Sequence, residues 1–196
     1  MLDLIIKNGQ CYIDGELKGV DVSVKNGKIQ NIGKISEKAK DTLDAKGLIV
    51  LPGCIDTQTH FREPGSTDTE DLHSGSRAAV AGGITAVFEM PNTNPPTSNK
   101  KEFQKKLDLA KNRMYCNYAF YFGATADNVN ELAELKNLEG CCGIKLFAGS
   151  STGNLLVADE KDIEKVFQNS SKVVAVHSED EEILNKNKKL IKDGDV

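Results

Sequence analysis

The chain has 196 residues, of which 39% are hydrophobic and 28% are charged, and 25 Lys and Arg against 29 Asp and Glu give a net charge of −4. This composition is typical of a globular domain and argues against a disordered or fibrous chain. A net negative charge and a pI near 5.5 exclude the basic surface that binding to nucleic acid or to an anionic membrane requires.

Residues 1–47 predict a small antiparallel β domain. Apolar and polar residues alternate in LDLIIKNG and in ELKGVDVSVKNGKIQNIG, which is the period of a half-exposed strand. Asn8-Gly9, Asp14-Gly15 and Asn26-Gly27 are turn sequences that favour tight connections between antiparallel strands.

Residues 48–196 predict five successive βα units. Five short segments are apolar almost throughout, as strands covered on both faces of a parallel sheet are. They are GLIVLPGCID, GITAVFEM, CNYAFYFGAT, GIKLF and KVVAVH. Amphipathic helices are expected over 69–81, 128–136, 159–168 and 179–192, and a further helix carries Phe103, Leu107 and Ala110 on one face. Since an eight-unit barrel needs more residues, the sequence predicts either an open five-stranded sheet or the front part of a barrel.

Polar side chains follow four of the five predicted strands. Functional groups in a parallel α/β fold gather at the carboxyl ends of the strands. At these ends the sequence has His60, Arg62, Asn92, Lys145 and His177. Each has an ordinary structural interpretation by itself: Arg62 would form a salt bridge with Glu63, for example, and Asn92 would cap a turn. Two histidines and a lysine at the ends of one sheet favour a functional site instead.

Four segments resemble dihydroorotases of the amidohydrolase superfamily, and the likeness extends over the whole chain. They are PGCIDTQTHFREPG, EMPNTNPPT, GIKLFAGSSTGN and VVAVHSEDEE. FREPG together with MPNT is more similar to dihydroorotases than to hydantoinases or allantoinases. The resemblance implies an α/β fold: a partial amidohydrolase-type (β/α)8 TIM barrel over 48–196, preceded by the small antiparallel β domain over 1–47.

The resemblance also implies a zinc hydrolase that opens the cyclic amide of dihydroorotate, reversibly with carbamoyl aspartate, in pyrimidine biosynthesis. His60 and His177 match histidine ligands of the metal, and neutral imidazole is a natural zinc ligand. Lys145 matches a lysine that many family members carboxylate, which gives an anionic oxygen ligand. Arg62 would hold the substrate carboxylate with its planar fork, and Asn92 would hydrogen-bond the same end of the substrate.

Two departures from the family pattern bear on activity. Gln58 stands where the family usually has the first histidine of a His-x-His pair, and an amide oxygen is a poorer zinc ligand than imidazole. The resemblance places the remaining histidine ligand and the catalytic aspartate after Val196, so no catalytic residue is assigned within the chain. We therefore expect the chain alone to be weakly active or inactive.

Two alternatives to an active hydrolase are left open. The first is an inactive fragment, a pseudoenzyme or a partner subunit without catalysis. The second is a complete open α/β protein that binds a small carboxylate through Arg62 and Asn92. Other cyclic ureides also stay open as substrates, as does a homodimer or a complementing second chain.

The expected compartment is the cytoplasm. The first residues lack the basic flank and long apolar stretch of a signal peptide, and no apolar run approaches the roughly 20 residues that span a bilayer. The five cysteines form no CxxC pair, and an odd count fits a reducing compartment better than a disulfide framework.

Overall fold

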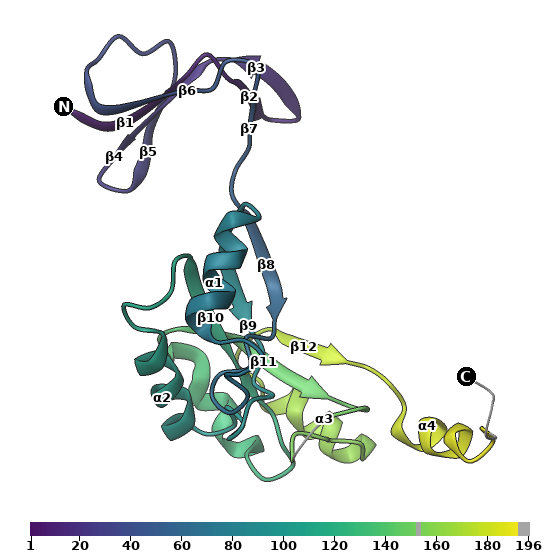
Figure 1. Cartoon of the computed structure of the whole chain (residues 1–196). Helices are drawn as coiled ribbons and strands as arrows, with labels where there is room; N and C mark the ends of the chain where they lie inside the picture. Colours follow the sequence, from purple (N-terminus) through teal and green to yellow (C-terminus); the bar gives the residue numbers. More distant parts are fainter. Residues whose placement is uncertain (152–153, 192–196) are drawn as a thin grey trace. The chain divides into compact units, whose positions relative to one another are not determined.

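The computed structural model describes residues 1–151 and 154–191 and divides into two compact units, Met1–Gly53 and Cys54–Val196 (Figure 1). The barrel segment predicted over 48–196 and the helix predicted over 179–192 both include residues outside this described part, namely 152–153 and 192–196.

The first unit contains two small sheets. The larger has the order β5-β4-β1-β6, and the smaller has the order β3-β2-β7. Their strands are β1 (Leu2–Lys7), β2 (Gln10–Ile13), β3 (Glu16–Gly19), β4 (Asp21–Lys25), β5 (Lys28–Gly33), β6 (Ala39–Asp44) and β7 (Ile49–Val50). Two of the three predicted hairpins are confirmed, because Asp14 and Asn26 have positive φ angles of 53° and 52° and each is followed by a glycine with positive φ. The third prediction, at Asn8-Gly9, was wrong, because β1 and β2 on either side of it belong to different sheets. β6 and β7 join their neighbours β1 and β2 in parallel, so each sheet combines both kinds of pairing.

The second unit is built on a five-stranded parallel sheet, which confirms the predicted α/β fold of a partial barrel. Its strands follow one another across the sheet in chain order, and the sheet is curled (Figure 1). They are β8 (Cys54–Thr59), β9 (Ile84–Glu89), β10 (Asn117–Gly123), β11 (Cys141–Phe147) and β12 (Val174–His177). The carboxyl ends of neighbouring strands therefore lie next to one another along one edge of the sheet.

One predicted strand was wrong in its extent. The segment GLIVLPGCID divides into β7, which pairs with β2 in the first unit, and β8, which pairs with β9 in the second. Leu51, Pro52 and Gly53 between them belong to no strand. Proline has no N–H to donate to a strand neighbour, and glycine weakens a strand because it has no side chain to pack, so the apolar run is interrupted there.

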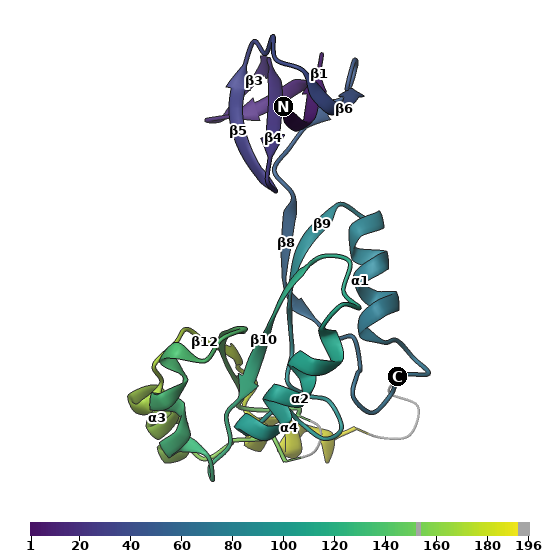
Figure 2. The same ribbon diagram turned by 90° about the vertical axis from the view of Figure 1, so that its left-hand side faces the viewer.

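In the described residues of the second unit, five helical segments accompany the strands. They are α1 (Leu72–Ala81), α2 (Lys100–Ala110), the 3-10 helix η1 (Val129–Asn137), α3 (Glu160–Asn169) and α4 (Glu181–Lys188). α1 packs against β9 and α2, and α3 packs against η1 (Figure 2). α1 begins three residues later than predicted because Asp71 is its N-cap, and the Asp71 carboxylate accepts a hydrogen bond of 2.6 Å from the Ser74 N–H. Over residues 1–151 and 154–191, no helix is long and apolar enough to cross a membrane.

A buried ion pair joins the end of β9 to α2. Glu89 is 1% exposed, and Lys106, which shares a helix face with the buried Phe103 and Ala110, is fully buried. The Lys106 ammonium contacts the Glu89 carboxylate and donates a hydrogen bond of 3.0 Å to the Met90 carbonyl. Burial raises the pKa of Glu89 to about 7, and the positive charge of Lys106 opposes that rise. The pair thus fixes the backbone at the point where β9 leaves the sheet.

Removing one member of this pair should destabilise the second unit strongly. Lys106→Met leaves the Glu89 carboxylate buried without its cation, and we expect a loss of about 3 kcal/mol in the free energy of unfolding, measured by urea denaturation. Adding Glu89→Gln should recover most of the loss, because the buried charge is removed. Lys105→Met, which breaks the exposed pair with Glu102, is the control and should cost less than about 1 kcal/mol. An equal loss in the single and double variants would contradict the role of the buried charge.

Candidate functional site

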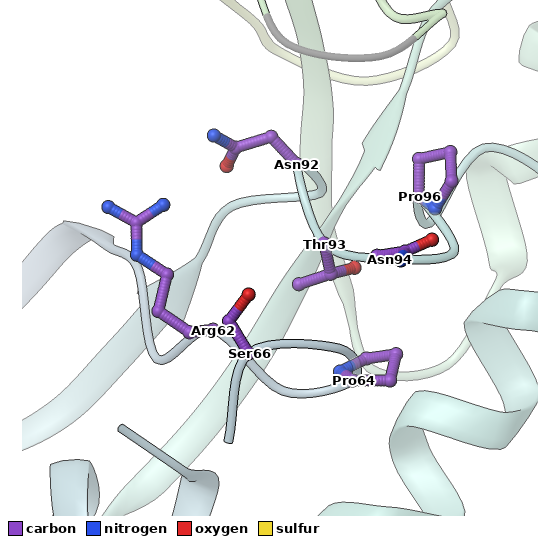
Figure 3. Close-up of a pocket in the computed structure, with 7 residues that line it drawn as sticks. All are labelled: Arg62, Pro64, Ser66, Asn92, Thr93, Asn94 and Pro96. Carbon is purple, nitrogen blue, oxygen red and sulfur yellow. The ribbon is translucent and has the colours of Figure 1, made fainter. Parts of the chain in front are cut away.

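Two loops, one after β8 and one after β9, enclose a pocket of about 350 Å³. Its lining residues, drawn in Figure 3, are Arg62, Pro64, Ser66, Asn92, Thr93, Asn94 and Pro96. The loops are joined directly, because the Asn94 N–H donates a hydrogen bond of 2.9 Å to the Pro64 carbonyl. Gly65, with a φ of 119°, lies so close that a Cβ there would come within 2.7 Å of the Asn94 Cβ. The pocket is therefore a joint product of both loops.

Arg62 and Asn92 supply the cationic and the amide group of this pocket. Their side chains extend to the same side of the two loops (Figure 3). Arg62 has a positive φ of 62°, a conformation that costs a residue with a Cβ about 1 kcal/mol. The Ser66 N–H donates a hydrogen bond of 2.9 Å to the Arg62 carbonyl and closes the turn. An exposed guanidinium beside an amide can bind a carboxylate through charge and hydrogen bonds.

His60 lies directly beside Asn92, at the end of β8. Its Nδ1 is 2.9 Å from the Asn92 Oδ1. Because an amide oxygen only accepts, Nδ1 carries the hydrogen, and the lone pair of Nε2 is left for a ligand. Burial lowers the pKa of His60, and the charges of Arg62 and Lys145 act in the same direction, while the hydrogen bond to Asn92 opposes them. His60 is therefore a neutral imidazole at neutral pH, the form that binds metal ions.

Lys145 is a buried amine on β11. It is 3% exposed, and its Nζ lies 4.9 Å from the centroid of the Phe147 ring. In the described part of the chain no acidic side chain pairs with it. Burial lowers the pKa of its ammonium, which favours the neutral amine. The neutral amine is the form of a lysine side chain that can act as a nucleophile.

His177 is the last residue of β12, and its side chain already has a partner, Glu179. Its Nε2 contacts the Glu179 carboxylate, and its ring centroid is 6.2 Å from that of Phe147 on the neighbouring strand. Gln58 is exposed near the end of β8. Among residues 1–151 and 154–191 there is no group of three or more His, Cys, Asp or Glu arranged to hold a metal ion.

The structure brings together only some of the residues singled out from the sequence. His60, Arg62 and Asn92 meet at the adjoining ends of β8 and β9, and the charge of Lys145 is close enough to lower the pKa of His60. His177 ends β12, three strands beyond β9 in the sheet, where it lies beside Phe147 of β11 and contacts Glu179.

Two ion pairs around the site were not predicted from the sequence. Glu63 pairs with Arg113 rather than with its neighbour Arg62, and a partner 50 residues away leaves no local signal. The pair of Glu89 and Lys106 does leave one: an acid ends an otherwise apolar strand, and a lysine follows Phe103 by three positions in an amphipathic helix.

The chain is similar to known proteins both through a family profile and through individual sequences. The sequence profile described as "Amidohydrolase family" matches residues 49–191. The chain is 37% identical over its whole length to a dihydroorotase of Methanosarcina mazei, of which it covers 43%. It is also 40% identical, over 82% of its length, to an allantoinase of Salmonella choleraesuis, of which it covers 36%.

Solved structures show the same relationship. An L-hydantoinase (dihydropyrimidinase) from Arthrobacter aurescens matches the whole chain with a TM-score of 0.91 at 29% sequence identity, and the chain covers 45% of that protein. The chain thus spans less than half the length of each of these relatives.

The hydrogen bond between His60 and Asn92 leads to a prediction for the pKa of His60. In the metal-free protein the pKa of His60 should lie below its usual 6.5, and Asn92→Ala should lower it further, because the bond to Asn92 raises it. Since the folded state binds fewer protons at His60 than the unfolded chain does, the contribution of this residue to stability decreases as the pH falls below 6.5. The pKa is measured by NMR titration of the ring protons. Asn94→Ala is the control, and a raised pKa in Asn92→Ala would contradict the assignment.

Proposed function

This chain belongs to the amidohydrolase family, and we propose that its pocket binds dihydroorotate and takes part in the hydrolysis of the ring amide to carbamoyl aspartate. The observation that carries the proposal is the contact between His60 and Asn92 at a pocket that Arg62 also lines. In this proposal Arg62 binds a carboxylate and His60 binds a metal ion, so the two ligands lie next to each other. In this proposal the reaction belongs to pyrimidine biosynthesis in the cytoplasm.

In the proposed complex, Arg62 and Asn92 bind the carboxylate of the ring. The guanidinium donates two parallel hydrogen bonds, and the Asn92 NH2 group donates a third, because its Oδ1 is occupied by His60. The Asn92 side chain thus orients two groups: its Oδ1 accepts from the imidazole, and its NH2 group donates to the ligand. The ring amide then lies on the His60 side of the pocket.

We further propose that His60, His177 and a carboxylated Lys145 hold zinc. The donor set fits in two respects: the Nε2 of His60 is free for a ligand, and Lys145 is a buried amine for which the described residues offer no acid partner. Carboxylation forms a bond between Nζ and the carbon of CO2, and Nζ releases a proton, which leaves an anionic oxygen ligand. A bound zinc ion supplies positive charge that polarises an amide carbonyl and lowers the pKa of water. For His177 to bind the ion, Glu179 must give up its contact with Nε2.

A non-catalytic role is the second candidate, and Gln58 is the observation that favours it. Without the first histidine of the family pair, the ion has one ligand fewer at the end of β8. In this alternative the pocket binds the ring and the chain acts as a partner of a catalytic subunit.

The proposal is tested by turnover on three rings. The zinc-loaded chain is assayed with dihydroorotate, allantoin and hydantoin, and the zinc content of the same sample is measured. We expect dihydroorotate to be preferred, and Arg62→Gln to lower its kcat/KM by about 100-fold, because the charge-assisted pair with the carboxylate is lost. Arg77→Gln, at an exposed arginine of α1, should have no effect. Binding of dihydroorotate without turnover would favour the non-catalytic candidate, and absence of both turnover and binding would contradict the proposal.

Carboxylation of Lys145 is tested separately from activity. After incubation with 13C-labelled bicarbonate, the chain should show a carbamate signal in its 13C NMR spectrum, and zinc should strengthen it. Lys145→Met should remove the signal. Lys172→Met is the matched control, because Lys172 lies just before β12 and is only partly buried. A signal that persists in Lys145→Met would contradict the assignment.

A further inference from the structure

The two neighbours of Arg62 both have side chains directed into the fold. Phe61 is 6% exposed, and its ring lies against the backbone of α1, where a Cβ on Gly75 would be 2.3 Å from the Phe61 Cδ1. The Glu63 side chain is 9% exposed. Arg62 lies between these two anchors with its φ of 62°, and its side chain lines the pocket. The conformation of Arg62 therefore depends on how firmly its neighbours are held.

Glu63 is held by both helices next to the loop. Its Oε2 accepts a hydrogen bond of 2.9 Å from the N–H of Leu72, the first residue of α1. Arg113, three residues after α2, donates to both carboxylate oxygens, from Nη1 at 2.7 Å and from Nη2 at 3.1 Å. The same Nη1 donates to the carbonyl of Leu109 in α2 at 3.1 Å. A planar guanidinium can satisfy two carboxylate oxygens and a carbonyl together, which a lysine ammonium cannot do in one fixed geometry.

We infer that Glu63 and Arg113 are positioning residues that hold Arg62 in its left-handed conformation and so direct its guanidinium into the pocket. The residues on either side of Glu63, Arg62 and Pro64, line the pocket, whereas Glu63 and Arg113 do not. Their effect on a ligand is therefore exerted through Arg62. That the ligand carries a carboxylate rests on the proposed function.

The charges around Arg62 also support a positioning role for Arg113. In the described part of the chain no acidic group lies within ion-pair distance of Arg62, although Glu63 is its neighbour in sequence. Arg113 occupies both oxygens of Glu63 and also lies 3.6 Å from Asp71. Because Arg113 compensates the negative charge of Glu63, the charge of Arg62 stays available to an anion. Without Arg113, the Glu63 carboxylate would compete with the ligand for Arg62.

The first arm of the test examines the loop without ligand. In isotope-labelled protein, the φ of Arg62 is determined from backbone coupling constants, and the exchange rate of the Ser66 amide, which bonds to the Arg62 carbonyl, is measured by NMR. Arg113→Gln should move Arg62 out of the left-handed region and speed up exchange at Ser66 by about tenfold. Arg77→Gln, the same change at an exposed arginine of α1, should alter neither.

The second arm measures the preference for a carboxylate. Dissociation constants are determined by NMR titration for dihydroorotate and for dihydrouracil, a ring that lacks the carboxylate. Arg113→Gln should reduce the preference for dihydroorotate by about tenfold, and Arg113→Lys, which keeps the charge but not the fork, by about threefold. A merely structural role would change both dissociation constants alike and leave their ratio unchanged.

The outcomes separate this inference from the proposed function. If Arg62 keeps its φ and the ligand preference is unchanged in Arg113→Gln, the positioning role is wrong while the proposed function stands. If the unchanged protein shows no preference for dihydroorotate, the proposed function fails, and the response of the Arg62 backbone still decides the positioning role. Should Arg113→Gln fail to fold, Arg113→Lys decides, and an unchanged loop and preference in that variant overturn the inference.

Discussion

The site depends on the side-by-side ending of β8 and β9. Their ends are linked by a hydrogen bond of 2.9 Å from the Met90 N–H to the Thr59 carbonyl, and the loops beyond are linked by the bond from Asn94 to Pro64. Because both strands run in the same direction, His60 and Asn92 leave the sheet at the same edge and meet, although they are 32 residues apart. Parallel pairing of neighbouring strands thus brings the two groups into contact.

The surrounding helices hold this edge in place through charged side chains. Lys106 of α2 reaches the end of β9, and Arg113 just beyond the same helix reaches the loop after β8. Desolvating such charges is costly, and the cost is offset only when the partners are well placed. Charged groups in these positions fix loops whose own backbones have little regular hydrogen bonding. The loops can therefore carry irregular conformations, such as the positive φ of Arg62, in a defined geometry.

Much of the architecture could be predicted from the sequence, because it follows from local rules. Continuous apolar runs predicted the parallel strands, and Asp14-Gly15 and Asn26-Gly27 predicted the two hairpins of the first unit. The same turn rule failed at Asn8-Gly9, which connects strands of different sheets. The rule for apolar runs failed at Pro52, where an apolar run crosses from one unit into the other. The α1 start was also misplaced, since acidic residues near a helix start fit both an N-cap and a first turn, and only the bond from Ser74 to Asp71 decides between them. The contact of Glu63 with Arg113 spans 50 residues, and no periodicity of the sequence encodes it.

The close approach of the loops after β8 and β9 also limits how the pocket can change, whether by design or by evolution. Gly65 leaves no room for a side chain opposite Asn94, so neither loop can change its course without displacing the other. A substitution in one loop must be matched by a compensating change in the other, so the residues of FREPG and PNTN form one structural unit. Exchanging both loops as a unit is therefore the route by which this scaffold can acquire a pocket of a different shape.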